Sequence, residues 1–180
     1  MFQRLFRREK SRNRQIVDAV YEKIVAAARR EVFFSDWGVP DIALGRFEIV
    51  SLHMLLFQHR LRNESGVARD IAQEIIDEFF TEVDHSLREL GIGDAGVPKR
   101  MKKLARMFYG RTVSYGAALE AGDRKELEAA LARNIWPETA DWPYAADLAT
   151  YVFTAYEALG GQRVEDICAG SIVFPAPNAE

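Results

Sequence analysis

The chain has 180 residues, of which 48% are hydrophobic and 28% are charged, and its net charge is −3 at pH 7. This composition is that of an ordinary soluble globular protein large enough to bury a sizeable core. A single cysteine, Cys168, excludes an internal disulfide framework. The start of the chain lacks the apolar core of a secretory signal, and no apolar run approaches the roughly 20 residues of a membrane-spanning helix.

The first fourteen residues are strongly basic, whereas the rest of the chain is acidic. Glu9 is their one acid, and the basic residues are Arg4, Arg7, Arg8, Lys10, Arg12 and Arg14. Such an arm can contact anionic lipid, RNA or an acidic partner, although a solvated terminus is an equally good interpretation. We expect residues 1–13 to be flexible, and any membrane contact to involve Phe2, Arg4, Leu5, Phe6, Arg7 and Arg8.

The spacing of apolar residues is helical along most of the chain. A stripe from Ile16 to Ala28 predicts an amphipathic helix over about residues 14–32. The next predicted helix, residues 44–62, is apolar over much of its circumference, which indicates a buried central helix. A third stripe, from Val67 to Leu90, ends at Gly91, where a glycine commonly terminates a helix.

Two further helices follow a glycine-rich loop. Pro98 is suited to the first turn of the fourth helix, whose apolar stripe includes Phe108 and Tyr109 and predicts that both are buried. Asp123 followed by Glu126 resembles a capping box, which predicts a fifth helix up to about residue 134.

The sixth predicted helix begins near Asp141 and stops at Gly160. Phe153 falls outside its apolar stripe, so it is a candidate for an exposed aromatic patch, although core packing explains its aromatic neighbours equally well. Together these patterns predict an all-α protein, a single irregular bundle of about six helices. The bundle would span residues 14–162, between the basic arm and a loose tail over residues 163–180.

The stretch LGIGDAGVPKRMKK superficially resembles a phosphate-binding loop, because Gly91, Gly93 and Gly96 have the spacing G-x-G-x-x-G. A dinucleotide site needs a strand before this loop and free backbone N–H groups after it. Here a long helix precedes the loop, and Pro98 lacks an N–H group. The sequence therefore indicates a turn between two helices rather than a nucleotide site.

No residue set in the sequence predicts a metal or a catalytic centre. Glu82 and His85 form one E-x-x-H pair, but the second copy that a di-iron site needs is missing. His53 and His59 are six residues apart, which is a poor spacing for one metal on a helix. Cys168 has no base placed to activate it. We therefore expect no catalytic residue, no metal and no cofactor.

A basic cluster stands at the start of the fourth predicted helix and along it. Its members are Lys99, Arg100, Lys102, Lys103, Arg106 and Arg111. Because a helix N-terminus already carries partial positive charge, cations there oppose local stability, and such a conflict often has a functional reason. The cluster would suit phosphates of RNA or lipid, or carboxylates of a protein, although a solvated helix face is also consistent with it.

Several segments resemble the ubiquinol–cytochrome c chaperone family. They are GVPDIALGRFEIVSLHMLLFQHRL (residues 38–61), DHSLRELGIGDAGVPKRMKKLARMFYGR (residues 84–111) and Tyr115. The similarity covers most of residues 14–160. The resemblance implies an all-helical protein without enzyme activity, which binds newly made cytochrome b and promotes its assembly into the cytochrome bc complex, respiratory complex III. Mitochondrial relatives act at the ribosome, and the absence of their long targeting extension suggests a bacterial form.

On this basis we expect residues 84–111 to form a polar ledge that contacts the client protein. The ledge would comprise Asp84, Arg88, Asp94, Lys99, Arg100, Lys102, Lys103, Arg106 and Arg111. An alternative function is an RNA- or ribosome-contacting helical module, and no DNA partner is expected. The expected location is the cytoplasm, with peripheral contact at the anionic inner face of the cytoplasmic membrane.

Overall fold

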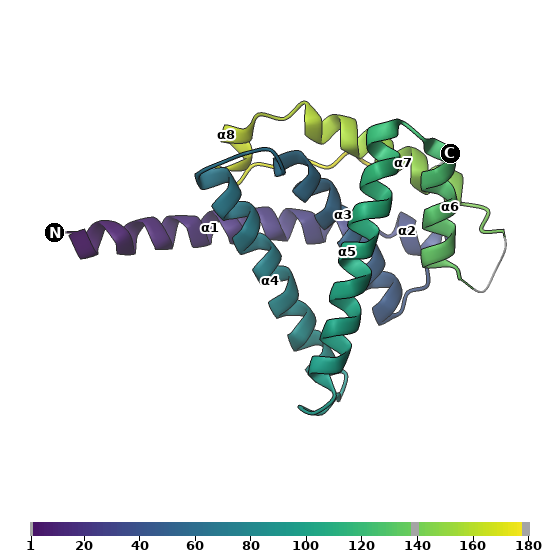
Figure 1. Cartoon of the computed structure of the whole chain (residues 1–180), viewed down its shortest axis with the longest axis horizontal. Coiled ribbons are helices and arrows are strands. Elements are labelled where there is room, and N and C mark those ends of the chain that lie inside the picture. The colour runs from purple at the N-terminus through teal and green to yellow at the C-terminus, as the bar shows by residue number, and fades with distance from the viewer. Residues whose placement is uncertain (1, 138–140, 178–180) are drawn as a thin grey trace.

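The computed structural model describes the backbone of residues 2–137 and 141–177, and the side chains of residues 13–137 and 141–177. This part of the chain is helical and contains no strand, which confirms the predicted all-α class (Figure 1). The helices are α1 (Phe2–Ala28), α2 (Val32–Ser35), α3 (Ala43–Leu61), α4 (Val67–Glu89), α5 (Val97–Ala121), α6 (Arg124–Ile135), α7 (Ala145–Gly160) and α8 (Val164–Ile167).

Helix α3 is the centre of the bundle, as its sequence predicted. It packs against α1, α4, α5, α6 and α7, so most of its circumference faces other helices. A helix in this position needs apolar residues on all sides rather than on one face. Its fully buried apolar side chains include Ile49, Leu52, Met54, Leu55, Leu56 and Phe57.

Helix α1 differs from its predicted range at both ends. It begins at Phe2 rather than near Arg14, so the segment predicted as a flexible arm is part of this helix and extends away from the other helices (Figure 1). Residues 2–13 contain no glycine or proline and many arginines, which have high helix propensity. The helix ends at Ala28, and residues up to Ser35 contribute the separate short helix α2.

Helices α4 and α5 form a hairpin with the glycine-rich loop at its tip, and they diverge from that tip in a V (Figure 1). Gly91 has a φ of +80°. The N–H of Ile92 donates to the carbonyl of Leu87 (3.2 Å), and that of Gly91 donates to the carbonyl of Arg88 (2.9 Å). This pair of bonds is a Schellman motif, so the predicted helix stop at Gly91 is confirmed. Pro98 lies in the first turn of α5, also as predicted.

Helices α6 and α7 close one side of the bundle against α3. Asp123 caps α6, because its Oδ1 accepts a hydrogen bond from the N–H of Glu126 at 3.0 Å, as the capping pattern predicted. Phe153, a candidate for an exposed aromatic patch, is buried instead. This side chain is 5% exposed, and the guanidinium of Arg124 lies over its ring at 4.5 Å from the centroid.

The tail is extended beyond α8 but it is not loose over the described residues 163–177. Phe174 is buried in the main core, and the side chain of Arg30 donates to the carbonyl of Phe174 (3.1 Å) and to that of Pro175. The ammonium of Lys23 donates to the carbonyl of Gly170 (2.8 Å). Apolar burial and these hydrogen bonds from α1 and the segment that follows it hold the tail, which corrects the prediction.

Candidate functional site

The predicted ledge separates into three groups. The first group lies at the tip of the hairpin, where Arg88 joins two of the predicted acids. Its Nε lies 2.6 Å from Oδ2 of Asp84, one turn earlier on α4, and its Nη1 bonds to Asp94 in the loop. Both acids favour the charged guanidinium and raise the pKa of Arg88. This ion-paired cluster connects the end of α4 to the loop.

The second group is a row of exposed cations on the first half of α5: Lys99, Arg100, Lys102, Lys103 and Arg106. None of them forms an ion pair within 4.0 Å with a side chain in the described part of the chain. Their charge is therefore available to a partner.

Arg111 is the exception among the predicted ledge residues, since it faces inward. Its Nε lies 2.5 Å from Oε2 of Glu48 on α3, and its Nη2 donates to Oε1 at 2.5 Å. The Glu48 side chain is only 3% exposed. Burial raises the pKa of Glu48 to about 7, although the charge of Arg111 acts in the opposite direction. Arg111 therefore connects α5 to α3 and is not part of the exposed ledge.

An apolar groove that the sequence did not predict lies beside the cation row. It has a volume of about 1040 Å³, at the upper limit of the range of ligand sites in proteins. Its floor and walls come from α1, α2, α3, α4, α5 and the loop at the hairpin tip. The apolar lining includes Val25, Phe34, Leu44, Phe47, Val50, Phe79, Val83, Leu87, Leu90, Ile92, Leu104 and Met107.

Charged side chains border this apolar groove. Two cations of the α5 row, Arg100 and Lys103, lie on its lining next to Leu104 and Met107. The lining also includes acids from α1 and α4, among them Glu22 and Glu82. Two of the apolar lining residues remain substantially open to solvent, Leu44 (47% exposed) and Leu90 (61% exposed). The site therefore combines an apolar floor with a cationic wall.

Tyr109 corrects a second prediction. It was expected to be buried with Phe108, but it is 53% exposed, whereas Phe108 is 1% exposed. Neighbouring residues on a helix point about 100° apart, so only Phe108 faces the core. The Tyr109 ring instead stacks on Phe80 of α4, with centroids 6.2 Å apart. It is not part of the apolar groove.

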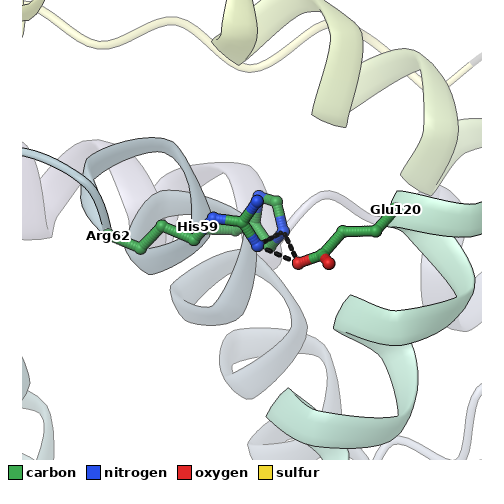
Figure 2. A network of polar contacts seen from close by, with 3 residues as sticks. All are labelled: His59, Arg62 and Glu120. Atoms are coloured by element: carbon green, nitrogen blue, oxygen red, sulfur yellow. Dashed lines mark hydrogen bonds and ion pairs between the residues drawn. The ribbon is translucent and has the colours of Figure 1, made fainter.

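A polar network ties the end of α3 to the end of α5. Figure 2 shows its three members, His59, Arg62 and Glu120. Arg62 donates to Nε2 of His59 at 2.6 Å and also bonds to Glu120. Burial, together with the charge of Arg62, lowers the pKa of His59, so the neutral ring accepts the hydrogen bond. Glu120 remains 49% exposed.

The surroundings of the histidines and the cysteine that were considered as metal or catalytic candidates indicate structural roles. Within the described side chains, no group of three or more His, Cys, Asp or Glu residues could hold a metal ion. His53 is fully buried between the carbonyl of Ile49 (2.8 Å) and the hydroxyl of Tyr151 (2.7 Å), and burial lowers its pKa to about 4. Burial also raises the pKa of Cys168, which disfavours a reactive thiolate.

The predicted membrane-contact residues, Phe2, Arg4, Leu5, Phe6, Arg7 and Arg8, belong to α1. Their side chains lie outside the described part of the chain. In the part that is described, none of the helices has the length and apolar character needed to span a bilayer.

Comparisons with known proteins agree with the resemblance in the sequence. The crystal structure of the Cbp3 homolog from Brucella abortus is 53% identical to this chain and superposes with a TM-score of 0.91, covering 98% of this chain and 97% of that one. A search of curated protein sequences found no match. A model of the ubiquinol-cytochrome C chaperone family matches residues 35–174. This chain therefore belongs to the ubiquinol-cytochrome C chaperone family.

Proposed function

We propose that this chain is a non-enzymatic assembly chaperone for respiratory complex III, and that it holds newly made cytochrome b until the cytochrome bc complex forms. The observation that carries this proposal is the apolar groove with free cations along its α5 wall, found in a member of a chaperone family. The family supports the assembly role, and the groove supports a client that is apolar with polar ends.

The floor of the groove would bind apolar surface of the client, and its wall would bind charged groups. Cytochrome b is a membrane protein whose apolar helices are joined by polar loops. Each 100 Å² of its apolar surface removed from water would contribute about 2.5 kcal/mol to binding, before the cost of ordering both partners. Arg100 and Lys103 stand where they would meet acidic loop residues or lipid phosphates at the end of an apolar segment. Such charges favour correct orientation and rapid encounter.

The cation row can be tested by charge reversal. Replacing Lys99, Arg100, Lys102 and Lys103 with glutamate should reduce capture of newly made cytochrome b by about tenfold or more. A loss of this size corresponds to the binding energy of about two weak ion pairs together with the repulsion that the new charges introduce. Helicity and melting should change little, because all four side chains are exposed. Capture is measured by affinity isolation of the chaperone after pulse labelling. Capture equal to that of the unaltered chain would refute the role of the row.

The apolar floor needs a separate test. Leu44→Ser combined with Leu90→Ser removes apolar surface from the groove border at two exposed positions, so the fold should persist while capture falls. A matched control is Val67→Ser with Val173→Ser, two exposed valines (60% and 64% exposed) outside the groove. Equal capture by the two double variants would exclude the groove as the client site.

The competing proposal, an RNA- or ribosome-contacting module, rests on the same cations. It has less support, because a single-strand platform stacks successive bases on several exposed aromatic rings, whereas among the described residues Tyr109 is the one exposed aromatic side chain close to the row. RNA affinity that falls steeply with salt concentration, together with cytochrome b capture that survives reversal of the cations, would favour this alternative.

We further propose that the N-terminal part of α1 holds the protein at the anionic inner face of the cytoplasmic membrane. Residues 2–8 alternate Phe2, Leu5 and Phe6 with arginines, and they continue the helix beyond the bundle (Figure 1). Each cation near such a surface contributes about 1 kcal/mol. Removing residues 1–12 should therefore decrease flotation with liposomes containing anionic lipid, and not with neutral ones. Identical flotation of both chains on anionic liposomes would rule out this anchor.

A further inference from the structure

A second concave surface, here called the outer groove, lies between the open ends of α4 and α5, farther from the hairpin tip than the apolar groove. It occupies the opening of the V between the start of α4 and the end of α5, with the end of α3 behind it (Figure 1). Its volume is about 700 Å³. The α5 side is lined by small residues, among them Gly116 and Ala117, and α4 adds Ala72. This surface has no part in the proposed client site.

Next to the outer groove, α5 exposes two large residues one helical turn apart. Tyr109 is 53% exposed and Val113 is 74% exposed. The positions Arg106, Tyr109, Val113, Ala117 and Glu120 are separated by three or four residues, so they follow one face of the helix. All five are exposed, and this face is therefore accessible to a partner helix.

When two copies of this face run in opposite directions and meet at Val113, each residue lies opposite one of complementary charge or size. Seven residues before Val113 stands a cation, Arg106, and seven residues after it stands an anion, Glu120. Four residues before it is the bulky Tyr109, and four residues after it is the small Ala117. An antiparallel copy of the same helix would thus place opposite charges together and large side chains against small ones.

We infer that two copies of this chain form a symmetric dimer by antiparallel packing of their α5 helices, with the two-fold axis at Val113. Tyr109 of one protomer then enters the outer groove of its partner beside the partner's Ala117. Arg106 meets the partner's Glu120, which Arg62 holds in place from within its own chain (Figure 2). Because the contact is isologous, each of these pairs occurs twice.

A second copy is favoured over an unrelated helix because the recognition pattern is palindromic in both charge and size. A foreign helix would have to supply an anion, a small residue, an apolar residue, a bulky residue and a cation in the right order. The face itself supplies that series when it is reversed. The proposed dimer leaves the apolar groove open, since the face contains none of its lining residues.

A disulfide placed on the two-fold axis tests the geometry directly. Val113→Cys, made in a Cys168→Ser chain, should form a disulfide-linked dimer under mild oxidation, because residues on the axis approach within the distance that a disulfide requires. The control is Val173→Cys in the same background, a valine in the tail that is also largely exposed (64%). Equal yields of linked dimer at the two positions, or none at position 113, would overturn the proposal.

Complementary charge variants test the pairing. Arg106→Glu and Glu120→Lys should each weaken the dimer by about tenfold or more, and an equimolar mixture should form a heterodimer in which both contacts are restored. Sedimentation equilibrium of the purified full chain measures this without any client, so the outcome is independent of the chaperone proposal. A wild-type chain that stays monomeric at its highest soluble concentration, or a mixture that remains as weak as the single variants, contradicts the dimer.

Discussion

At the scale of single residues, the contact between Arg111 and Glu48 is the most consequential one in the core. It places two charges between α5 and α3, where water is largely excluded. The desolvation of such a pair can cost as much as its attraction returns, whereas loss of one partner leaves a buried charge uncompensated. The pair therefore determines the position of the hairpin on the central helix α3 more than it increases the free energy of unfolding.

Substitution of Arg111 should show this asymmetry. Arg111→Met is expected to lower the free energy of unfolding by about 3 kcal/mol at pH 9, because ionised Glu48 is then buried without its countercharge. The charge of Arg111 lowers the pKa of Glu48, which burial raises to about 7, so the pKa of Glu48 in the variant lies above that value. As the pH falls, the variant therefore takes up the proton on Glu48 before the unaltered chain does, and the loss of stability shrinks.

The control for this experiment is the double variant Glu48→Leu with Arg111→Met, which removes both charges and should unfold within about 1 kcal/mol of the unaltered chain. Urea unfolding at pH 9 and pH 6 provides the measurement. A single variant as stable as the double variant at pH 9 would show that the pair has no energetic role.

The distinction between Arg111 and the exposed cations could not be predicted from the sequence. All six basic residues share one segment, and their spacing does not show that Glu48, 63 positions earlier, lies opposite only one of them. Tyr109 was misplaced for a related reason. An apolar stripe predicts which face of a helix is buried, but the edge of that face depends on where the neighbouring helix lies.

At the scale of elements, the turn from α4 into α5 shows how far local sequence determines structure. Gly91 ends α4 in the left-handed region, and the two Schellman hydrogen bonds then reverse the chain toward Pro98. This much was predictable, because helix stops and starts are encoded by a few neighbouring residues. The extension of α1 to Phe2 and the packing of the tail were not, since both depend on contacts or propensities that no short motif marks.

The glycines of this loop make a matched pair for testing the turn. Gly91→Ala should lower the free energy of unfolding by about 1 kcal/mol, because a residue with a Cβ is strained at a φ of +80°. Gly93 has no such φ, and a Cβ at either position would meet no atom within 4 Å. Gly93→Ala should therefore change stability by less than about 0.5 kcal/mol. Thermal or urea unfolding that ranks the two variants equally would contradict this interpretation of the turn.

At the scale of the whole molecule, the hairpin carries two concave surfaces of different character. The apolar groove opens near the hairpin tip, between the hairpin, α1 and α3, and the outer groove opens between the open ends of α4 and α5. The apolar groove could not be predicted from the sequence, because its lining comes from segments between residue 21 and residue 107. The expected ledge placed the client surface on polar residues alone, whereas the structure has an apolar groove beside the cation row.

The central claim, that this chain assists assembly of the cytochrome bc complex, is tested most directly in the source organism. The gene is deleted, and reduced-minus-oxidised difference spectra of b- and c-type cytochromes are recorded from its membranes. We predict a loss confined to the cytochromes of the bc complex, restored by the unaltered chain and not by the Leu44→Ser, Leu90→Ser variant. Normal bc-complex spectra in the deletion strain, or an equal loss of all cytochromes, would contradict the claim.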